Sequence, residues 1–145
     1  MLNHNSPRIL IVDDDEGHAI LIRENLEAAG LRNPIEHFRD GQAVLDFFSQ
    51  WQRNDAESFL VLLDIRMPKV DGIEVLRRLK ADAELSKLPI IMLTTTDDSR
   101  EVERCYELGC NVYIQKPVDY ERFAEAIRRL GMFMSLVLVP HMSSH

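Results

Sequence analysis

The chain has 145 residues, 46% hydrophobic and 28% charged, a composition typical of one globular domain. Its formal net charge of −7 argues against nucleic-acid binding, because phosphate backbones favour clustered Lys and Arg. The histidines and cysteines lack zinc-ligand spacing, and no stretch approaches the about 20 apolar residues of a membrane span. We therefore expect a cytoplasmic protein without a secretory leader, whose Cys105 and Cys110 either pack in the core or form a redox pair.

Short apolar segments alternate with helical patterns along the chain. Apolar composition predicts five strands, over residues 8–12, 35–38, 59–63, 90–93 and 112–115. Helical spacing and Gly, Asp and Pro signals predict five helices, which follow the acidic run up to Gly30, begin at Asp40-Gly41, cover 71–81 and 99–108, and run from about 119 to as far as 139. This alternation predicts a parallel sheet with right-handed crossovers and helices on both faces.

The predicted strands are of two kinds. Segments 8–12, 59–63 and 90–93 are almost entirely apolar, which is typical of strands buried on both faces, whereas 35–38 and 112–115 are mixed and suit sheet edges. We therefore predict an α/β fold with a doubly wound, five-stranded parallel sheet of order 2-1-3-4-5, the flavodoxin-like arrangement. In that order the first and third strands are neighbours at the switch point where ligands bind.

Polar residues follow four of these strands. Asp13 and Asp14 follow the first strand, Asp64 the third, Thr94 the fourth and Lys116 the fifth. Each has a plain structural alternative, since the acids could cap a helix, Thr94 could form a turn and Lys116 could be a solvated lysine. Because the carboxyl ends of parallel strands share one edge, the coincidence of all four favours a functional site there.

The charges of this set indicate its chemistry. Two carboxylates about 4 Å apart repel by about 4 kcal/mol at an effective dielectric of about 20, so Asp13, Asp14 and Asp64 together need a cation or a proton. An all-oxygen, incomplete ligand set suits Mg²⁺. The sequence has no glycine-rich nucleotide cradle, so we predict that a carboxylate takes a phosphoryl group while Mg²⁺ and Lys116 neutralise its oxygens.

Taken together, these motifs resemble the receiver domain of two-component response regulators, of the chemotaxis-regulator type. The resemblance covers about residues 8–130 and is carried by the pair Asp13-Asp14, the segment 64–72, Thr94 and the pair Lys116-Pro117. It implies a signalling protein that accepts a phosphoryl group from a sensor histidine kinase and catalyses only its own phosphotransfer and dephosphorylation.

The resemblance also assigns roles at the acidic end of the site. It implies that Asp64 is the phosphoacceptor, modified to 4-aspartylphosphate. Asp14, Asp64 and the backbone carbonyl of Arg66 would bind Mg²⁺ directly, and Asp13 would act largely through water.

The remaining roles implied by the resemblance concern the phosphoryl group and the switch. Thr94 would hydrogen-bond the phosphoryl group, Lys116 would pair with it, and the Lys116-Pro117 bond would be cis. Tyr113 matches the aromatic switch position, with a packing residue of the edge strand as the alternative. Arg66 and Thr96 occupy the positions that tune phosphoryl lifetime in the family.

The C-terminal part extends past the usual end of such a domain. We expect one receiver domain over residues 1–145, with a core of about 8–130 and an extension over 131–145. The segments 105–114 and 130–140 are similar to single-domain regulators of phytochrome-like histidine kinases.

The predicted last helix also suggests an oligomeric state. Its apolar residues have the 4-3-4-3 spacing of packed helices, at Phe123, Ile127, Leu130, Met134 and Val137. We predict a homodimer through this helix, and a tail that folds back on its own domain is the alternative.

Two other functions use similar residues. A phosphatase of the haloacid-dehalogenase type would also form an aspartyl-phosphate, but its DxDxT motif is absent after the first strand. A receiver-like domain that only binds partners is disfavoured by the intact set of acids, Thr94 and Lys116. For the kinase, we predict docking on the first helix, where Ile20 lies opposite the apolar stripe.

Overall fold

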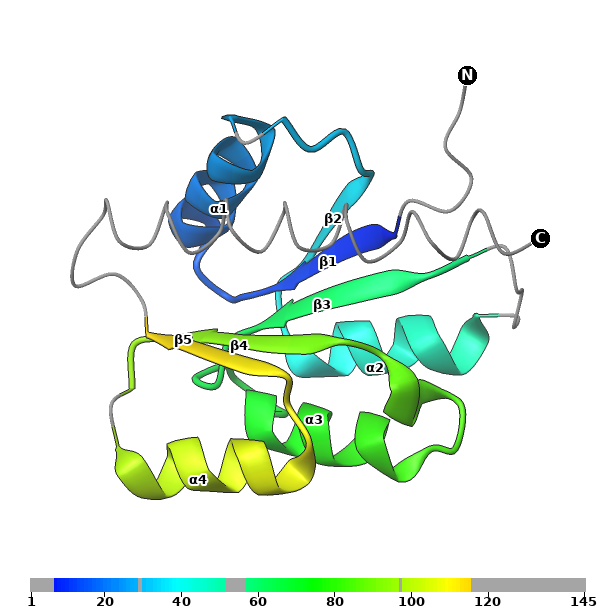
Figure 1. Cartoon of the computed structure of the whole chain (residues 1–145), viewed down its shortest axis with the longest axis vertical. Coiled ribbons are helices and arrows are strands. Elements are labelled where there is room, and N and C mark those ends of the chain that lie inside the picture. The colour runs from blue at the N-terminus through cyan, green and yellow to red at the C-terminus, as the bar shows by residue number, and fades with distance from the viewer. Residues whose placement is uncertain (1–6, 29, 52–56, 97, 116–145) are drawn as a thin grey trace.

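The computed structural model describes residues 7–28, 30–51, 57–96 and 98–115 (Figure 1). Lys116, the expected cis bond to Pro117, the predicted fifth helix and the C-terminal extension lie outside the described residues.

A five-stranded parallel sheet forms the centre of the molecule. Its strands are β1 (Arg8–Val12), β2 (Ile35–Phe38), β3 (Phe59–Leu63), β4 (Ile90–Thr94) and β5 (Val112–Gln115). Their order is β2-β1-β3-β4-β5, which confirms the predicted doubly wound fold. The carboxyl ends of β1, β3, β4 and β5 all lie on the left of Figure 1.

Helices cover both faces of the sheet, as the alternation predicted. The structure has α1 (Glu16–Ala28) on one face, and α2 (Gly41–Gln50), α3 (Gly72–Ala81) and α4 (Ser99–Leu108) on the other (Figure 1). None of the helices in the described ranges combines the length and apolar character that crossing a bilayer requires.

The helix boundaries have local causes. The carboxylates of Asp40, Asp71 and Asp98 accept hydrogen bonds from backbone N–H groups in the first turns of α2, α3 and α4. Gly109 ends α4 in the left-handed region, at φ 106°, where a residue without a Cβ is favoured. These caps fix where each helix begins relative to the strand before it.

One short element differs from the sequence prediction. A 3₁₀-helix, η1 (Leu85–Lys87), lies between α3 and β4 in a segment for which no element was predicted. Asp82 accepts hydrogen bonds from the N–H groups of Glu84 and Leu85, and Lys80 donates to the carbonyl of Ser86. These side-chain contacts stabilise a single tight turn, which the spacing of apolar residues in the sequence does not predict.

Alternating residues of the strands build two apolar layers. Leu10 and Val12 of β1 pack towards α2 and α3, whereas Ile9 and Ile11 pack towards α1. All five residues of β3 and all five of β4 are buried. This confirms that the continuously apolar strands are central, and it leaves their polar continuations at the edge of the sheet.

Candidate functional site

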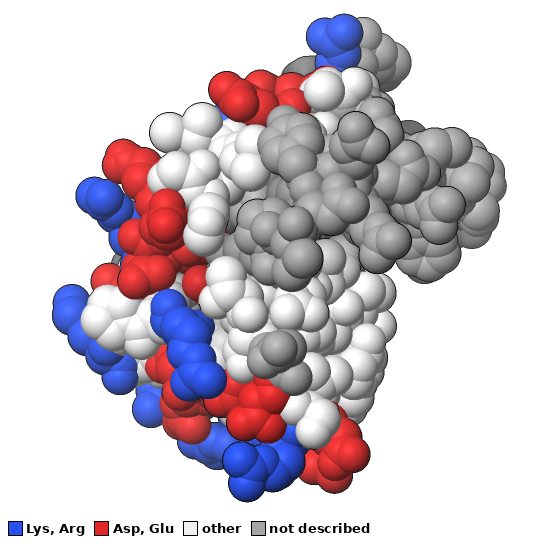
Figure 2. Space-filling view, turned by 90° about the vertical axis from the view of Figure 1, so that its left-hand side faces the viewer, with Lys and Arg blue, Asp and Glu red and all other residues white. Residues whose placement is uncertain are grey.

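Three carboxylates meet where β1 and β3 end. The two strands pair in register up to Val12 and Leu63, and the N–H of Asp64 donates to the carbonyl of Val12 at 2.9 Å. Asp13, Asp14 and Asp64 each place a carboxylate oxygen within 4.8 Å of the other two. Figure 2 looks onto this edge of the sheet, where acidic side chains cluster beside exposed Lys and Arg.

Two members of this acidic cluster are buried. Asp13 is 1% exposed and Asp64 7% exposed, while Asp14 is open to solvent. Backbone amides orient the buried pair: the N–H of Asp15 donates to Asp13 Oδ1 and the N–H of Ile65 to Asp64 Oδ1, both at 2.8 Å. The two carboxylates are therefore held in place rather than free to turn away from each other.

The donor chemistry of the cluster fits a hard divalent cation. At the 4.8 Å limit two full charges repel by about 3.5 kcal/mol for an effective dielectric of about 20. Folding therefore brings like charges together at a cost that a bound cation offsets. The ligands are all oxygens, and one carboxylate faces solvent, which suits a partly hydrated Mg²⁺ or Mn²⁺ better than zinc.

The loop after Asp64 is packed too closely to move freely. The N–H of Gly72 donates to the carbonyl of Ile65 at 2.8 Å, and a Cβ at Gly72 would collide with the backbone carbonyl of Asp64. Lys69 adopts a left-handed conformation with φ 67°, and its ammonium lies 4.0 Å from a carboxylate oxygen of Asp40. Asp64 is thus fixed from both sides, by β3 and by the first turn of α3.

The end of β4 places hydroxyl groups near the edge occupied by the acids. Thr94 is fully buried and is the last residue of β4, one residue beyond the predicted end of that strand. The Tyr113 hydroxyl donates to the carbonyl of Thr96 at 3.0 Å. Burial, with Cys105 and Glu101 nearby, raises the pKa of Tyr113 to about 12, so the hydroxyl remains a proton donor at neutral pH.

Comparisons with known proteins agree with this arrangement. Residues 9–128 match the response regulator receiver domain. The chain belongs to the receiver domain family of response regulators. It is 35% identical to the response regulator Rcp1 of Synechocystis over 132 residues, which cover 89% of this chain and 90% of Rcp1. The resemblance inferred from the sequence is thereby confirmed.

Solved structures of receiver domains share the fold. A receiver domain from Rhodospirillum rubrum has a TM-score of 0.80 and 45% identity, covering 89% of this chain and 94% of its own. The phosphorylated cyanobacterial phytochrome response regulator RcpA has a TM-score of 0.78 and 28% identity, covering 88% and 93%. The Mn²⁺-bound form of Rcp1 has a TM-score of 0.77 and 29% identity, covering 88% and 93%.

Within this receiver domain, the sequence pattern missed Glu101. Its Oε1 accepts hydrogen bonds from Arg66 Nη2 at 2.9 Å and from Thr96 Oγ1 at 2.8 Å. In the sequence, Glu101 stands three residues after the cap residue Asp98, a spacing typical of a capping box. The side chain contacts the two neighbouring loops, which local spacing does not indicate.

His37 was the second residue that sequence reasoning missed. Its Nε2 donates to the backbone carbonyl of Asp13 at 2.7 Å, and the N–H of Asp13 donates to the carbonyl of Phe38 at 3.0 Å. The edge strand β2 therefore holds the acidic loop through both main chain and side chain. The signal in the sequence was a polar residue within a predicted strand. In the structure His37 of β2 lies opposite Ile11 of β1.

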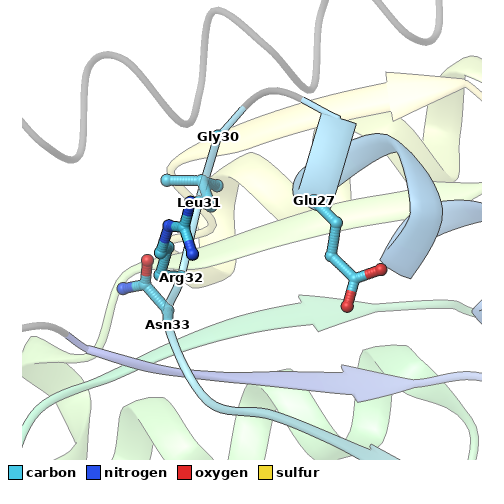
Figure 3. A pocket seen from close by; sticks show the side chains of 5 residues that line it. All are labelled: Glu27, Gly30, Leu31, Arg32 and Asn33. Carbon is cyan, nitrogen blue, oxygen red and sulfur yellow. The ribbon is translucent and has the colours of Figure 1, made fainter.

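A hollow elsewhere on the receiver domain lies away from the acidic cluster. Glu27 borders it from one side, and Arg32 and Asn33 border it from the other (Figure 3). It follows α1 and precedes β2, so it lies at the amino edge of the sheet. The Asn33 amide donates to the carbonyl of Pro7 at 2.8 Å and ties this connection to the start of β1.

Proposed function

We propose that this receiver domain acts as a single-domain response regulator and that Asp64 is its phosphoacceptor. The observation that carries the proposal is the meeting of Asp13, Asp14 and Asp64 within 4.8 Å at the ends of β1 and β3. The kinase donor is a phosphohistidine, whose P–N bond breaks as an Asp64 carboxylate oxygen forms a P–O bond. The acyl phosphate is later hydrolysed, which returns the carboxylate and inorganic phosphate.

Asp64 is favoured as the acceptor over its two neighbours because of where it lies. It is buried at the end of a central strand, and the hydrogen bond from the N–H of Ile65 to its Oδ1 orients the carboxylate. Asp13 is also buried, but its Oδ1 closes the turn into α1 through the N–H of Asp15. Asp14 is exposed to solvent.

The proposed metal is Mg²⁺, held by Asp13, Asp14, Asp64 and the backbone carbonyl of Arg66. Support comes from the all-oxygen acidic cluster and from the Mn²⁺-bound form of the similar protein Rcp1. When bound, the ion supplies positive charge that lowers the repulsion between carboxylate and phosphoryl oxygens. Asp13 and Asp64 are oriented for this role by backbone amides in the protein itself.

The phosphoryl group would be recognised by residues from the neighbouring strands. We assign the Thr94 hydroxyl as its hydrogen-bond donor and the Lys116 ammonium as its ion-pair partner. Tyr113 is the proposed switch residue, and its hydroxyl is already engaged with the loop after Thr94 through the carbonyl of Thr96. The N–H of Thr96 donates to Thr94 Oγ1 at 3.4 Å, so a change at Thr94 would alter the contact that holds the Tyr113 side chain.

The assignment is tested with acetyl phosphate, which donates a phosphoryl group without a kinase. With Mg²⁺, intact mass should show one phosphoryl adduct on the wild-type protein and none on Asp64→Asn. Asp15→Asn is the matched control, since it changes an exposed neighbouring acid, and it should keep the adduct. An adduct at full level in Asp64→Asn would exclude Asp64 as the acceptor.

The same samples separate a signalling protein from a phosphatase. We infer that catalysis is limited to the protein's own phosphotransfer and dephosphorylation. Steady turnover of small phosphate esters in the presence of Mg²⁺ would contradict this inference and indicate that the protein is a phosphatase.

We propose that this protein is cytoplasmic and that its partner is a phytochrome-like sensor histidine kinase. The structural relative RcpA is a phytochrome response regulator, which supports this input. On α1, Ile20 is 52% exposed, whereas Ala19 and Ile22 are buried against the sheet. An exposed apolar side chain near the start of α1 suits docking of a partner helix.

Replacing Ile20 tests this docking site. Ile20→Glu should slow phosphotransfer from the cognate kinase at least several-fold and leave acetyl phosphate labelling unchanged. Val112→Glu places the same charge at another exposed apolar residue, on β5, and should not slow the kinase reaction in the same way. Unchanged kinase transfer in Ile20→Glu would remove α1 from the interface.

We also propose that the protein is a homodimer through its C-terminal helix, from the apolar spacing between Phe123 and Val137. Sedimentation at micromolar concentration should give a dimer. A monomer at tens of micromolar, with and without phosphoryl donor, would favour the fold-back alternative.

A further inference from the structure

One carboxylate oxygen joins the loop that follows β3, which contains Asp64, to the loop that follows β4. Glu101 Oε1 accepts from Arg66, which follows β3, and from Thr96, which follows β4. Glu101 itself lies in the first turn of α4. Its side chain is 22% exposed and that of Arg66 is 62% exposed, so the pair lies at the surface of the site.

The Arg66–Glu101 pair lies close to the proposed phosphoryl position. Arg66 is two residues after Asp64 in the same loop. Glu101 accepts hydrogen bonds from the side chains of Arg66 and Thr96, and the Tyr113 hydroxyl donates to the carbonyl of Thr96. Four side chains from β3, β4–α4 and β5 segments therefore share one short stretch of the edge.

A phosphoryl group at Asp64 would compete with Glu101 for the guanidinium. It replaces a single carboxylate charge by a group with more negative charge and three acceptor oxygens, and Arg binds such groups in a bidentate manner. Glu101 is held by Thr96, whereas most of the Arg66 side chain is exposed to solvent. Arg66 is therefore the partner that can change its contact.

We propose that Glu101 is a positioning residue that keeps Arg66 away from Asp64, and that phosphorylation draws Arg66 away from Glu101. This inference rests on the proposed phosphorylation of Asp64. Glu101 is bound to Thr96, and the Thr96 carbonyl accepts from the Tyr113 hydroxyl, so the exchange at Arg66 reaches the proposed switch residue. The pair thus opposes the activated state until the phosphoryl group forms.

Linkage gives the direction and the size of the effect. If the Arg66–Glu101 ion pair must open before a phosphoryl mimic binds, the free energy of the pair lowers the affinity of the protein for the mimic. Removing the pair should then raise that affinity. Exposed ion pairs contribute little, which corresponds to an affinity change of about 1.5- to 5-fold. A larger change would need more than the loss of this pair.

The test measures binding of beryllofluoride, a phosphoryl mimic, in the presence of Mg²⁺. Glu101→Gln removes the charge that holds Arg66 but keeps an oxygen that accepts from Thr96. We expect this variant to bind beryllofluoride about 1.5- to 5-fold more tightly than wild type, with occupancy followed by amide NMR, which also reports whether the fold is intact. Glu103→Gln, at an exposed position of the same helix, is the control and should bind like wild type.

A double variant shows whether Glu101 acts through Arg66. In an Arg66→Met background, adding Glu101→Gln should change the affinity by less than measurement error, since the partner is already gone. Equal or weaker binding in Glu101→Gln alone, or the same gain in both backgrounds, overturns the inference and leaves the acceptor assignment standing. Wild-type binding that persists in Asp64→Asn overturns the proposed function and this inference with it.

Discussion

Charged side chains are arranged differently at the amino edge of the sheet, where the strands begin, and at the carboxyl edge, where they end. At the amino edge, Arg8 lies between two acids, with Nη2 2.6 Å from Glu36 and Nη1 3.2 Å from Glu57. The same guanidinium lies over the rings of Phe47 and Phe59, at 5.5 and 5.7 Å from their centroids. At the carboxyl edge, Asp13, Asp14 and Asp64 are brought within 4.8 Å of one another.

The surroundings of the charges differ as well. The amino edge is lined by an aromatic cluster in which Phe59 packs edge-on against Phe47, Phe48 and Trp51. The indole of Trp51 donates to Glu57 at 3.0 Å, so aromatic packing and ion pairing support each other. The carboxyl edge instead holds its buried acids with backbone amides and leaves Asp14 open to solvent.

The contrast indicates a division of labour within one sheet. Ion pairs that pack against aromatic rings contribute to stability without a bound ligand. Like charges held at fixed positions lower stability in the absence of a ligand, and such an arrangement is typical of a binding site. The amino edge should therefore respond to mutation through folding, and the carboxyl edge through ligand binding.

Truncating Phe59 gives the largest expected effect. Phe59→Ala should lower the free energy of unfolding by about 3–5 kcal/mol, because the ring is 2% exposed and packs on three other aromatic side chains. Urea unfolding followed by circular dichroism measures this loss. At a temperature where the variant is still folded, acetyl phosphate labelling should persist, and its complete loss there would contradict the division between the edges.

Mg²⁺ and the acidic cluster give an intermediate effect of opposite sign. Mg²⁺ at 100 times its dissociation constant should stabilise the wild-type protein by about 2.7 kcal/mol. Asp13→Asn should raise stability by about 1 kcal/mol without Mg²⁺, because one repelling charge is gone, and should gain less from the ion.

Thermal unfolding with and without Mg²⁺ measures both the stabilisation by the ion and the change in stability of Asp13→Asn. Asp46→Asn, which removes a charge from an exposed position of α2, is the control and should keep the wild-type response to Mg²⁺. A variant Asp13→Asn that is less stable than wild type without Mg²⁺ would show that Asp13 is mainly structural.

The smallest expected effect concerns Tyr113 at alkaline pH. Its folded pKa is raised to about 12 from the ordinary 10.0, chiefly by burial. Between pH 10 and 12 the unfolded chain loses this proton first, so stability falls as pH rises, by about 1 kcal/mol for a partly exposed hydroxyl. Urea midpoints across this range should fall less steeply in Tyr113→Phe, and parallel curves would contradict the burial of the hydroxyl.

Much of this fold is determined by local sequence. Continuous apolar runs such as 59–63 specify central strands, and Asp40 and Gly109 specify where helices begin and end. The strand order follows from which segments are apolar throughout, because a central strand has no solvated face. The positions of Asp13, Asp64 and Thr94 then follow, since parallel strands end at one edge.

The tertiary structure decided which polar side chains contact one another. Glu101 reaches Arg66 and Thr96, and His37 reaches the carbonyl of Asp13, although neither contact follows a period in the sequence. Arg8 likewise finds its acids 28 and 49 residues away along the chain. Apolar periodicity records which face of an element is buried, but a hydrogen bond depends on the distance between particular atoms, and only the packed elements set that distance.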